Sequence, residues 1–147
     1  MTILGYTLAL VLAVTVLGAV FSREISRPDW QQIVELSLAE ADDSEKPTLL
    51  LSCPADGEIL FRHSPVGLVE GDTAHLVVSK TRQSLLIKEK RGVSSRGENH
   101  AYAAQGHICG IPAQGFDVRF ESEITGQWAT ASLSCTGGSM ATPELLN

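Results

Sequence analysis

The chain has 147 residues, with 11 Lys and Arg against 17 Asp and Glu, and a formal net charge of −6 at pH 7. This length suits a single domain, and the acidic balance argues against nucleic acid as a partner, because phosphate binding needs accumulated positive charge. With 5% aromatic residues and three cysteines, the composition also excludes collagen-like, disordered and disulfide-dense proteins.

The first segment has the properties of a membrane anchor. Residues 2–21 carry no charge, and eleven of these twenty residues are Leu, Ile, Val or Phe. As a helix this run would reach ~30 Å, the thickness of the hydrocarbon core of a bilayer. A cleaved signal peptide is the alternative, but no basic residue precedes the run, which is also long for a signal peptide. We therefore predict that residues 1–22 form an uncleaved single-pass transmembrane anchor.

Two signals disagree about which side of the membrane the rest of the chain occupies. Arg23 and Arg27 follow the apolar run, and the positive-inside rule then places the C-terminal part in the cytoplasm. A strand-rich domain with cysteines at strand ends instead suits an oxidising compartment. We favour the outer, periplasmic side of the cytoplasmic (inner) membrane.

Residues 23–46 are acidic and show helical spacing of apolar residues. Trp30, Ile33, Val34, Leu38 and Ala41 follow the pattern i, i+3, i+4, i+8 and i+11, which predicts a short amphipathic helix over 28–41. An acidic linker would follow it and end at Pro47. The helix would pack on the domain behind it or bind a partner, and Trp30 is a candidate interaction residue.

Residues 47–137 have the pattern of short antiparallel strands. The runs 48–53, 58–63, 74–79 and 84–88 are bounded by Pro, Gly or Asp, as in a sandwich or barrel. The fold class is therefore mainly β: a transmembrane helix and an amphipathic helix, then a small antiparallel β-sandwich or barrel-like domain. Residues 138–147 are expected to be a flexible tail.

A hairpin around Thr125-Gly126 is the most specific structural prediction. A two-residue turn there pairs Ile124 with Gln127 and places Val118 opposite Leu133, so that apolar side chains share one face. Trp128 then falls on the polar face, beside Glu123. On that face it is either covered by another segment or part of a contact surface.

A basic stretch supplies the other candidate contacts. Between Lys80 and Arg96 there are six basic residues and one acid, Glu89. The loop over 88–96 is a solvated tip or a contact for anionic lipid headgroups or an acidic partner. Its candidate interaction residues are Lys88, Lys90, Arg91 and Arg96.

The three cysteines allow one intramolecular disulfide. Chain-entropy estimates of ~3.5 kcal/mol for Cys109–Cys135 and ~4.5 kcal/mol for Cys53–Cys135 do not separate the two pairings. We predict Cys109–Cys135, because the loop 110–115 can bring Cys109 back to the final hairpin. Cys53 would then be a buried thiol or an intermolecular bridge.

Motifs for catalysis are missing from the sequence. There is no G-x-S-x-G, H-E-x-x-H or C-x-x-C and no phosphate-binding glycine loop, so we expect a non-enzyme without a cofactor. His107 and Cys109 alternate on one strand face and are the candidate ligands for a soft metal such as copper. A secreted or periplasmic copper-binding module is therefore one alternative function.

Gly5-Tyr6-Thr7-Leu8 resembles the cleavage region of type IV pilin-like proteins. The resemblance implies a long N-terminal helix, kinked near Pro28, before an antiparallel sheet with a C-terminal disulfide. A filament subunit is thus a second alternative. The leader lacks basic residues, and Leu10 stands where that family usually has glutamate, so the match rests on four residues.

The function that the sequence favours is that of a tethered subunit. Residues 1–22 would hold the β domain at the bilayer, where it acts as a binding, accessory or structural subunit of a membrane assembly. Small residues at Gly5, Ala9, Ala13 and Gly18 are suited to close packing against a neighbouring helix. The expected partners are therefore the lipid bilayer and a membrane protein.

Overall fold

The computed structural model describes residues 30–147 apart from 82–83, 94–95, 112–114 and 136–137. This part of the chain contains ten strands and no helix, which confirms the prediction of a mainly β protein. The strands are β1 (Trp30–Glu35), β2 (Ser37–Glu40), β3 (Thr48–Cys53), β4 (Glu58–Val69), β5 (Ala74–Thr81), β6 (Ser84–Arg91), β7 (Asn99–Cys109), β8 (Gly115–Ser122), β9 (Trp128–Ser134) and β10 (Ser139–Ala141).

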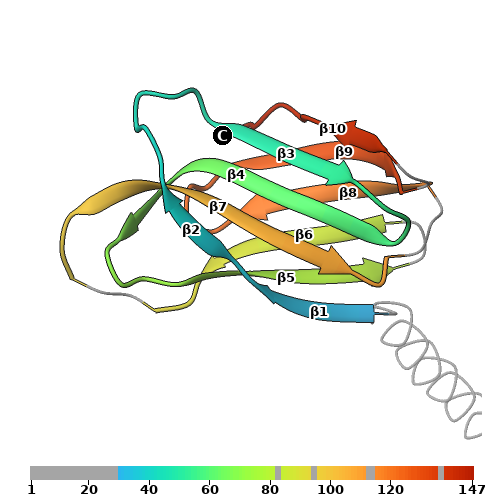
Figure 1. Cartoon of the computed structure of the whole chain (residues 1–147), viewed down its shortest axis with the longest axis horizontal. Coiled ribbons are helices and arrows are strands. Elements are labelled where there is room, and N and C mark those ends of the chain that lie inside the picture. Colours follow the sequence, from blue (N-terminus) through green and yellow to red (C-terminus); the bar gives the residue numbers. More distant parts are fainter. Residues whose placement is uncertain (1–29, 82–83, 94–95, 112–114, 136–137) are drawn as a thin grey trace, which may run out of the picture.

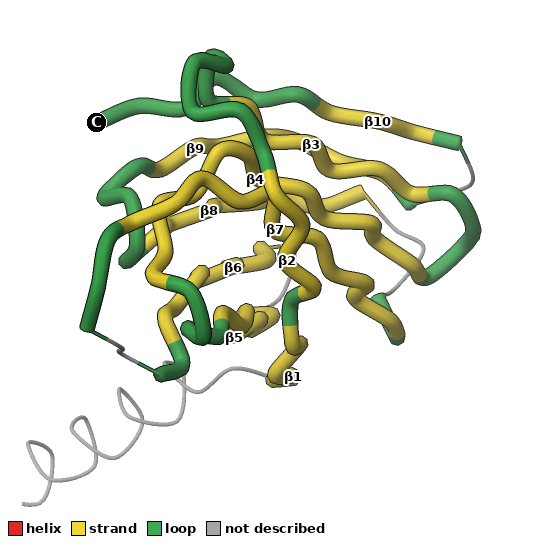
Figure 2. Tube along the Cα trace, turned by 60° about the vertical axis from the view of Figure 1, so that its left-hand side comes forward, coloured by secondary structure: helices red, strands yellow, loops and turns green. Residues whose placement is uncertain are grey.

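Two five-stranded sheets pack face to face (Figure 1). Sheet A has the order β1-β5-β6-β8-β9, and sheet B has the order β10-β3-β4-β7-β2. All neighbours are antiparallel except β6 and β8, which are parallel because the chain crosses to sheet B through β7 between them. The view in Figure 2 shows the two sheets as separate layers.

The core lies between the sheets because buried residues alternate along most strands, as in β5 and β8. Phe61 of sheet B meets Phe120 of sheet A with ring centroids 5.6 Å apart. Each such pair removes two apolar surfaces from water. The main cluster also contains Leu49, Leu51, Ile59, Leu76, Val78, Leu85, Ile87, Ile108, Val118 and Leu133.

The prediction of a helix over 28–41 is wrong: none of the residues that the structure describes in this range is helical. Trp30–Glu35 and Ser37–Glu40 are strands, and they pair with β5 and β7 respectively. The chain therefore passes from sheet A to sheet B at Leu36, whose N–H donates to the carbonyl of Ala74 at 3.0 Å. Ile33 shared the helical spacing but is 66% exposed. Pairing with distant strands thus overrides a local periodicity that fits a helix by coincidence.

The hairpin of β8 and β9 has the predicted faces and a different register. Val118 lies opposite Ala131, not Leu133, and the whole pairing is displaced by two residues. The displacement keeps every apolar side chain inward because side chains alternate with a period of two. The loop is longer than predicted because Ser122 pairs with Gln127, while the N–H of Glu123 donates to the carbonyl of Glu89 in β6.

The disulfide joins Cys53 to Cys135, with Cα atoms 5.2 Å apart, and Cys109 is free and exposed. The predicted Cys109–Cys135 pairing is therefore wrong. Cys53 ends β3 in sheet B and Cys135 follows β9 in sheet A, so the bond ties the two sheets together. By the chain-entropy estimate this long loop gives the larger stabilisation, ~4.5 kcal/mol.

The sandwich has two ends, and we call the end at which β1 begins the entry end. Trp30 pairs with Lys80, next to Thr81, the last residue of β5, which lies opposite Ser84 at the start of β6. The parallel pairing of β6 and β8 and the antiparallel pairing of β8 and β9 extend this end across sheet A to the disulfide. In sheet B the same end holds Glu58 and Cys109, which pair with each other. The opposite end, where β4 and β6 end and β7 begins, is the far end.

The segment expected as a flexible tail contains a strand. β10 pairs with β3, and Leu146 forms two backbone hydrogen bonds with Trp128, of 2.8 and 2.9 Å. The C-terminal residues thus cover part of the outer edge of β9. Within the described residues, no helix is long and apolar enough to cross a membrane; the apolar run 2–21 lies outside them.

Candidate functional site

Three metal-ligating side chains converge on the outer face of sheet B at the entry end. Glu58 is the first residue of β4, and Cys109, the last residue of β7, lies directly opposite it. His107 is two residues before Cys109 and therefore shares its face. We call Glu58, His107 and Cys109 the outer-face cluster.

The ligand atoms of the outer-face cluster all lie within 4.8 Å of one another. The His107 Nε2 atom is 3.3 Å from a carboxylate oxygen of Glu58. The side chains of His107 and Glu58 are 48% and 38% exposed, and Cys109 is also exposed. The cluster therefore offers sulfur, nitrogen and oxygen donors to an ion arriving from solvent.

The backbone beside the outer-face cluster is fixed by turns and sheet pairing. Gly57, with φ of +80°, turns the chain into β4, a conformation that glycine adopts without steric cost. Its carbonyl accepts a hydrogen bond of 3.0 Å from the N–H of Ile111, beyond β7. The two strands are thus held together at the end where the ligands sit.

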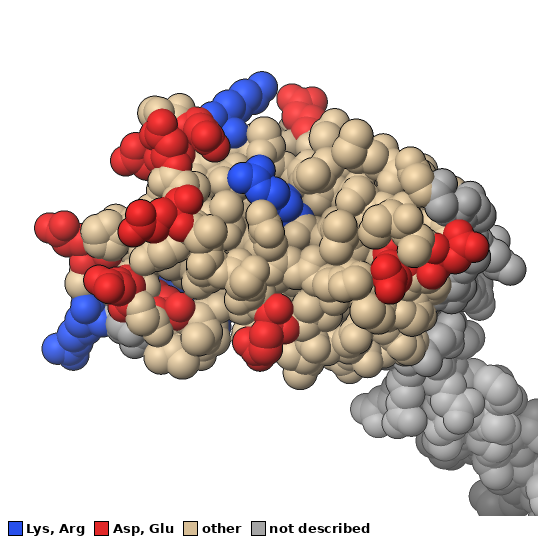
Figure 3. Space-filling view, viewed as in Figure 1, with Lys and Arg blue, Asp and Glu red and all other residues tan. Residues whose placement is uncertain are grey.

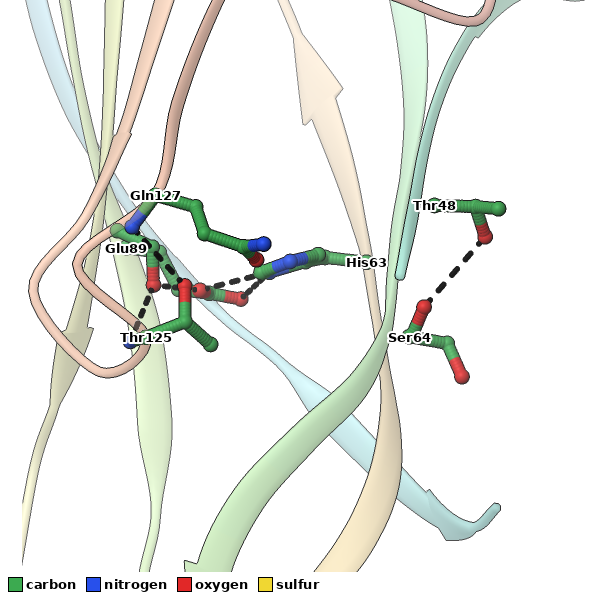
Figure 4. Close-up of polar contacts among 7 residues, drawn as sticks. Thr48, His63, Ser64, Glu89, Thr125 and Gln127 are labelled. Carbon is green, nitrogen blue, oxygen red and sulfur yellow. Dashed lines mark hydrogen bonds and ion pairs between the residues drawn. The ribbon is translucent and has the colours of Figure 1, made fainter. Parts of the chain in front are cut away.

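A second group of polar residues is buried between the sheets (Figure 4). His63 Nδ1 of β4 lies 2.9 Å from Glu89 Oε2 of β6, and both side chains are 0% exposed. The Ser122 hydroxyl donates to the same carboxylate oxygen at 2.5 Å and accepts from the N–H of Thr125. The serine contacts the glutamate and not the histidine, so this is no arrangement for activating a nucleophile. Because His63 and Glu89 are completely buried, this group is a polar link between the two sheets within the core.

Trp128 lies on the outer face of sheet A, as predicted, and is partly buried. The guanidinium carbon of Arg119 stands 5.0 Å from the ring centroid, a cation–π contact. Leu146 is held against the Trp128 backbone by its two hydrogen bonds. The sequence predicted that Trp128 is either covered by another segment or part of a contact surface, and these contacts favour the first alternative.

The predicted basic contacts are spread along β6 and the loop after it. Lys90 forms an ion pair of 3.4 Å with Glu123, and Arg91 one of 3.5 Å with Asp72. Lys88 is half-buried on the same strand, and Arg96 is exposed in the loop at the far end. Two of these four charges are therefore matched by carboxylates. Trp30, the remaining candidate, packs partly buried against the core.

Acidic side chains gather at the far end of the sandwich, at the left of Figure 3. A groove of about 680 Å³ lies there, and its carboxylates are Glu40, Asp42, Asp43 and Glu70. The pKa of Asp42 is lowered from its ordinary value because the backbone N–H and the hydroxyl of Ser44 donate hydrogen bonds to it. This end is therefore a site of negative charge.

Sequence reasoning found two members of the outer-face cluster and missed the third. His107 and Cys109 are recognisable from their spacing on one strand. Glu58 is about fifty residues away in the sequence, and only the antiparallel register of β4 and β7 brings it beside them. The pairing of two strands is not encoded in the spacing within either one. Glu89 as the buried partner of His63 was missed for the same reason.

No protein-family model, curated protein or solved structure matches this chain. Its function is therefore inferred from its own residues.

Proposed function

We propose that the protein is a single-pass membrane protein whose β-sandwich acts, without catalysis, as a binding or accessory subunit of a membrane assembly. The observation that carries the proposal is the short distance along the chain between two features. The uncharged run ends at Phe21 and strand β1 begins at Trp30. With the run in the bilayer, the remaining residues 22–29 span at most ~29 Å even when fully extended.

The short connection keeps the entry end near the bilayer, because β1 begins at that end. We therefore place the far end away from the membrane. The acidic groove fits this arrangement, because its four carboxylates lie at the far end, while Glu58 at the entry end contacts His107. Anionic headgroups repel such a surface. The exposed Arg96 also lies at the far end, which argues against the loop over 88–96 as a lipid contact.

The disulfide supports a position on the outer side of the cytoplasmic membrane. Cys53 and Cys135 are completely buried, and their bond links the two sheets. Structural disulfides persist in oxidising compartments and are rare in the cytosol. The positive-inside signal from Arg23 and Arg27 is the opposing consideration, and it rests on two residues.

Labelling of an introduced cysteine tests the orientation. Val93, in the loop at the far end, is 53% exposed, and V93C in a C109S background supplies one accessible thiol. We expect a membrane-impermeant maleimide to label it in intact cells. The matched control is C109S alone, which should take no label. Labelling of V93C only after the membrane is opened would reverse the orientation, and recovery of a free chain starting beyond Phe21 would remove the anchor.

Purification in mild detergent tests the role as a subunit. We expect the full chain to elute with a stoichiometric membrane protein that is absent from a parallel purification of the untagged strain. A monomer without a co-purifying protein, still resistant to alkaline extraction from membranes, would keep the anchor and contradict the role in an assembly.

A further inference from the structure

We propose that Glu58, His107 and Cys109 form a binding site for one divalent transition-metal ion, with Zn²⁺ as the best match, and leave one coordination position open. This inference goes beyond the proposed role as a tethered subunit and does not depend on the anchor. It starts from the convergence of three different donors, from two strands, on a surface that solvent can reach.

The donor set favours a borderline ion. Zinc takes thiolate sulfur, imidazole nitrogen and carboxylate oxygen as ordinary ligands, in tetrahedral geometry. A carboxylate is a poor partner for the soft ion Cu⁺, and Mg²⁺ and Ca²⁺ bind oxygen ligands rather than sulfur. The sequence suggested copper from His107 and Cys109 alone. Because the fold adds the carboxylate of Glu58 to these two ligands, zinc is the preferred ion.

The geometry needs only small side-chain movements. Ligand atoms on a tetrahedral zinc ion lie ~3.3–3.8 Å apart, from metal–ligand distances of about 2.0–2.3 Å. The three donors already lie within 4.8 Å of one another, and His107 is 3.3 Å from Glu58. All three side chains are at least partly exposed and free to change rotamer, while the paired strands fix their Cα atoms.

The charges at the site also suit a dication. With the thiol ionised and the imidazole neutral, the three ligands carry two negative charges, which an ion of charge +2 neutralises. The hydrogen-bonding contact between His107 and Glu58 is replaced by coordination of both to the same ion. Three protein ligands with an outward-facing fourth position, taken by water or by a donor from a partner, resemble the open arrangement of zinc sites that exchange ligands.

Cobalt substitution and zinc titration of the full chain in mild detergent test the site. The protein is washed with a chelator, and mass spectrometry under non-reducing conditions checks that Cys109 is free and the Cys53–Cys135 bond intact. We expect one Co²⁺ per chain, with a thiolate-to-cobalt charge-transfer absorption that Zn²⁺ abolishes. C109S should lose that absorption. H107Q and E58Q should weaken Zn²⁺ binding at least ~10-fold, since even residues that only hydrogen-bond to metal ligands change metal affinity by about 10–100-fold.

The matched control is H100Q, which changes an exposed histidine of the same strand at the far end and should leave the affinity unchanged. Unfolding curves of the metal-free variants establish that each one is folded. The proposal is overturned if Co²⁺ binds without the thiolate absorption, if no saturable binding occurs, or if H107Q and C109S bind as tightly as the unmodified chain. Thiol trapping in membranes that finds Cys109 already in an intermolecular disulfide would also overturn it.

Discussion

His63 and Glu89 bring two ionisable side chains into the centre of an otherwise apolar core. The histidine ring also packs edge-on against Phe120, with ring centroids 5.2 Å apart. A buried carboxylate is tolerated only when hydrogen bonds replace the water it has lost. Here His63 and Ser122 provide them from opposite sheets, so the three residues fix how the sheets align.

Replacing one member of this buried group should therefore be costly. We expect E89L to lower the free energy of unfolding by about 3–5 kcal/mol, because His63 loses its partner in the core. Chemical denaturation measured by tryptophan fluorescence gives the value. The double variant H63L/E89L should lose less than E89L, since the unpaired histidine is also removed and only the Ser122 hydroxyl has lost its acceptor.

The exposed change E98Q is the control and should alter the stability by less than about 0.5 kcal/mol. Equal stability of E89L and the unmodified protein would mean that the contact between His63 and Glu89 does not hold the sheets together.

At the scale of the elements, the passage from β1 to β2 depends on a glycine in β7. A Cβ atom added at Gly106 would lie 2.6 Å from Leu36 Cδ2 and 3.3 Å from Val34 Cγ1. Gly106 thus leaves room for the residues at which the chain changes sheets. No local sequence pattern identifies this role, because the contact spans about seventy residues.

Enlarging this position should loosen the edge formed by β1 and β2. We expect G106V to lower the free energy of unfolding by about 1–3 kcal/mol, the usual cost of overpacking, and to speed hydrogen exchange in β1. The matched control is G67A in β4, where an added Cβ has no neighbour within 4 Å. If G106V is no less stable than G67A, Leu36 has another way to pack.

Particular elements show how far local sequence patterns reach. The starts of β3, β4, β5 and β6 were predicted correctly. Those of β3, β4 and β5 follow Pro, Gly or Asp, and such turn signals, like the alternation of apolar residues, are local properties. The inward faces of β8 and β9 were also correct, but their register depends on a hydrogen bond from Glu123 to a third strand. The helix expected at Trp30 and the pairing expected for Cys109 failed for the same reason: both are decided by contacts between distant segments.

For the molecule as a whole, the proposed anchor predicts different heights above the bilayer. Thr81 lies at the entry end and Val93 at the far end, separated by the length of β6, ~25 Å for eight residues. In a C109S background, we expect a fluorophore on T81C to be quenched by headgroup acceptors in vesicles far more than one on V93C. Equal quenching would show that the sandwich lies on its side, and the reverse order would place the far end at the membrane.

β1 belongs to sheet A and β2 to sheet B, and this has a practical consequence for producing the domain without the apolar run 2–21. β1 covers one edge of β5, and β2 covers one edge of β7. A recombinant fragment cut at Pro47 would uncover two hydrogen-bonding edges at once, and open edges favour intermolecular sheet growth and precipitation. A fragment intended for crystallisation or NMR should therefore start no later than Trp30.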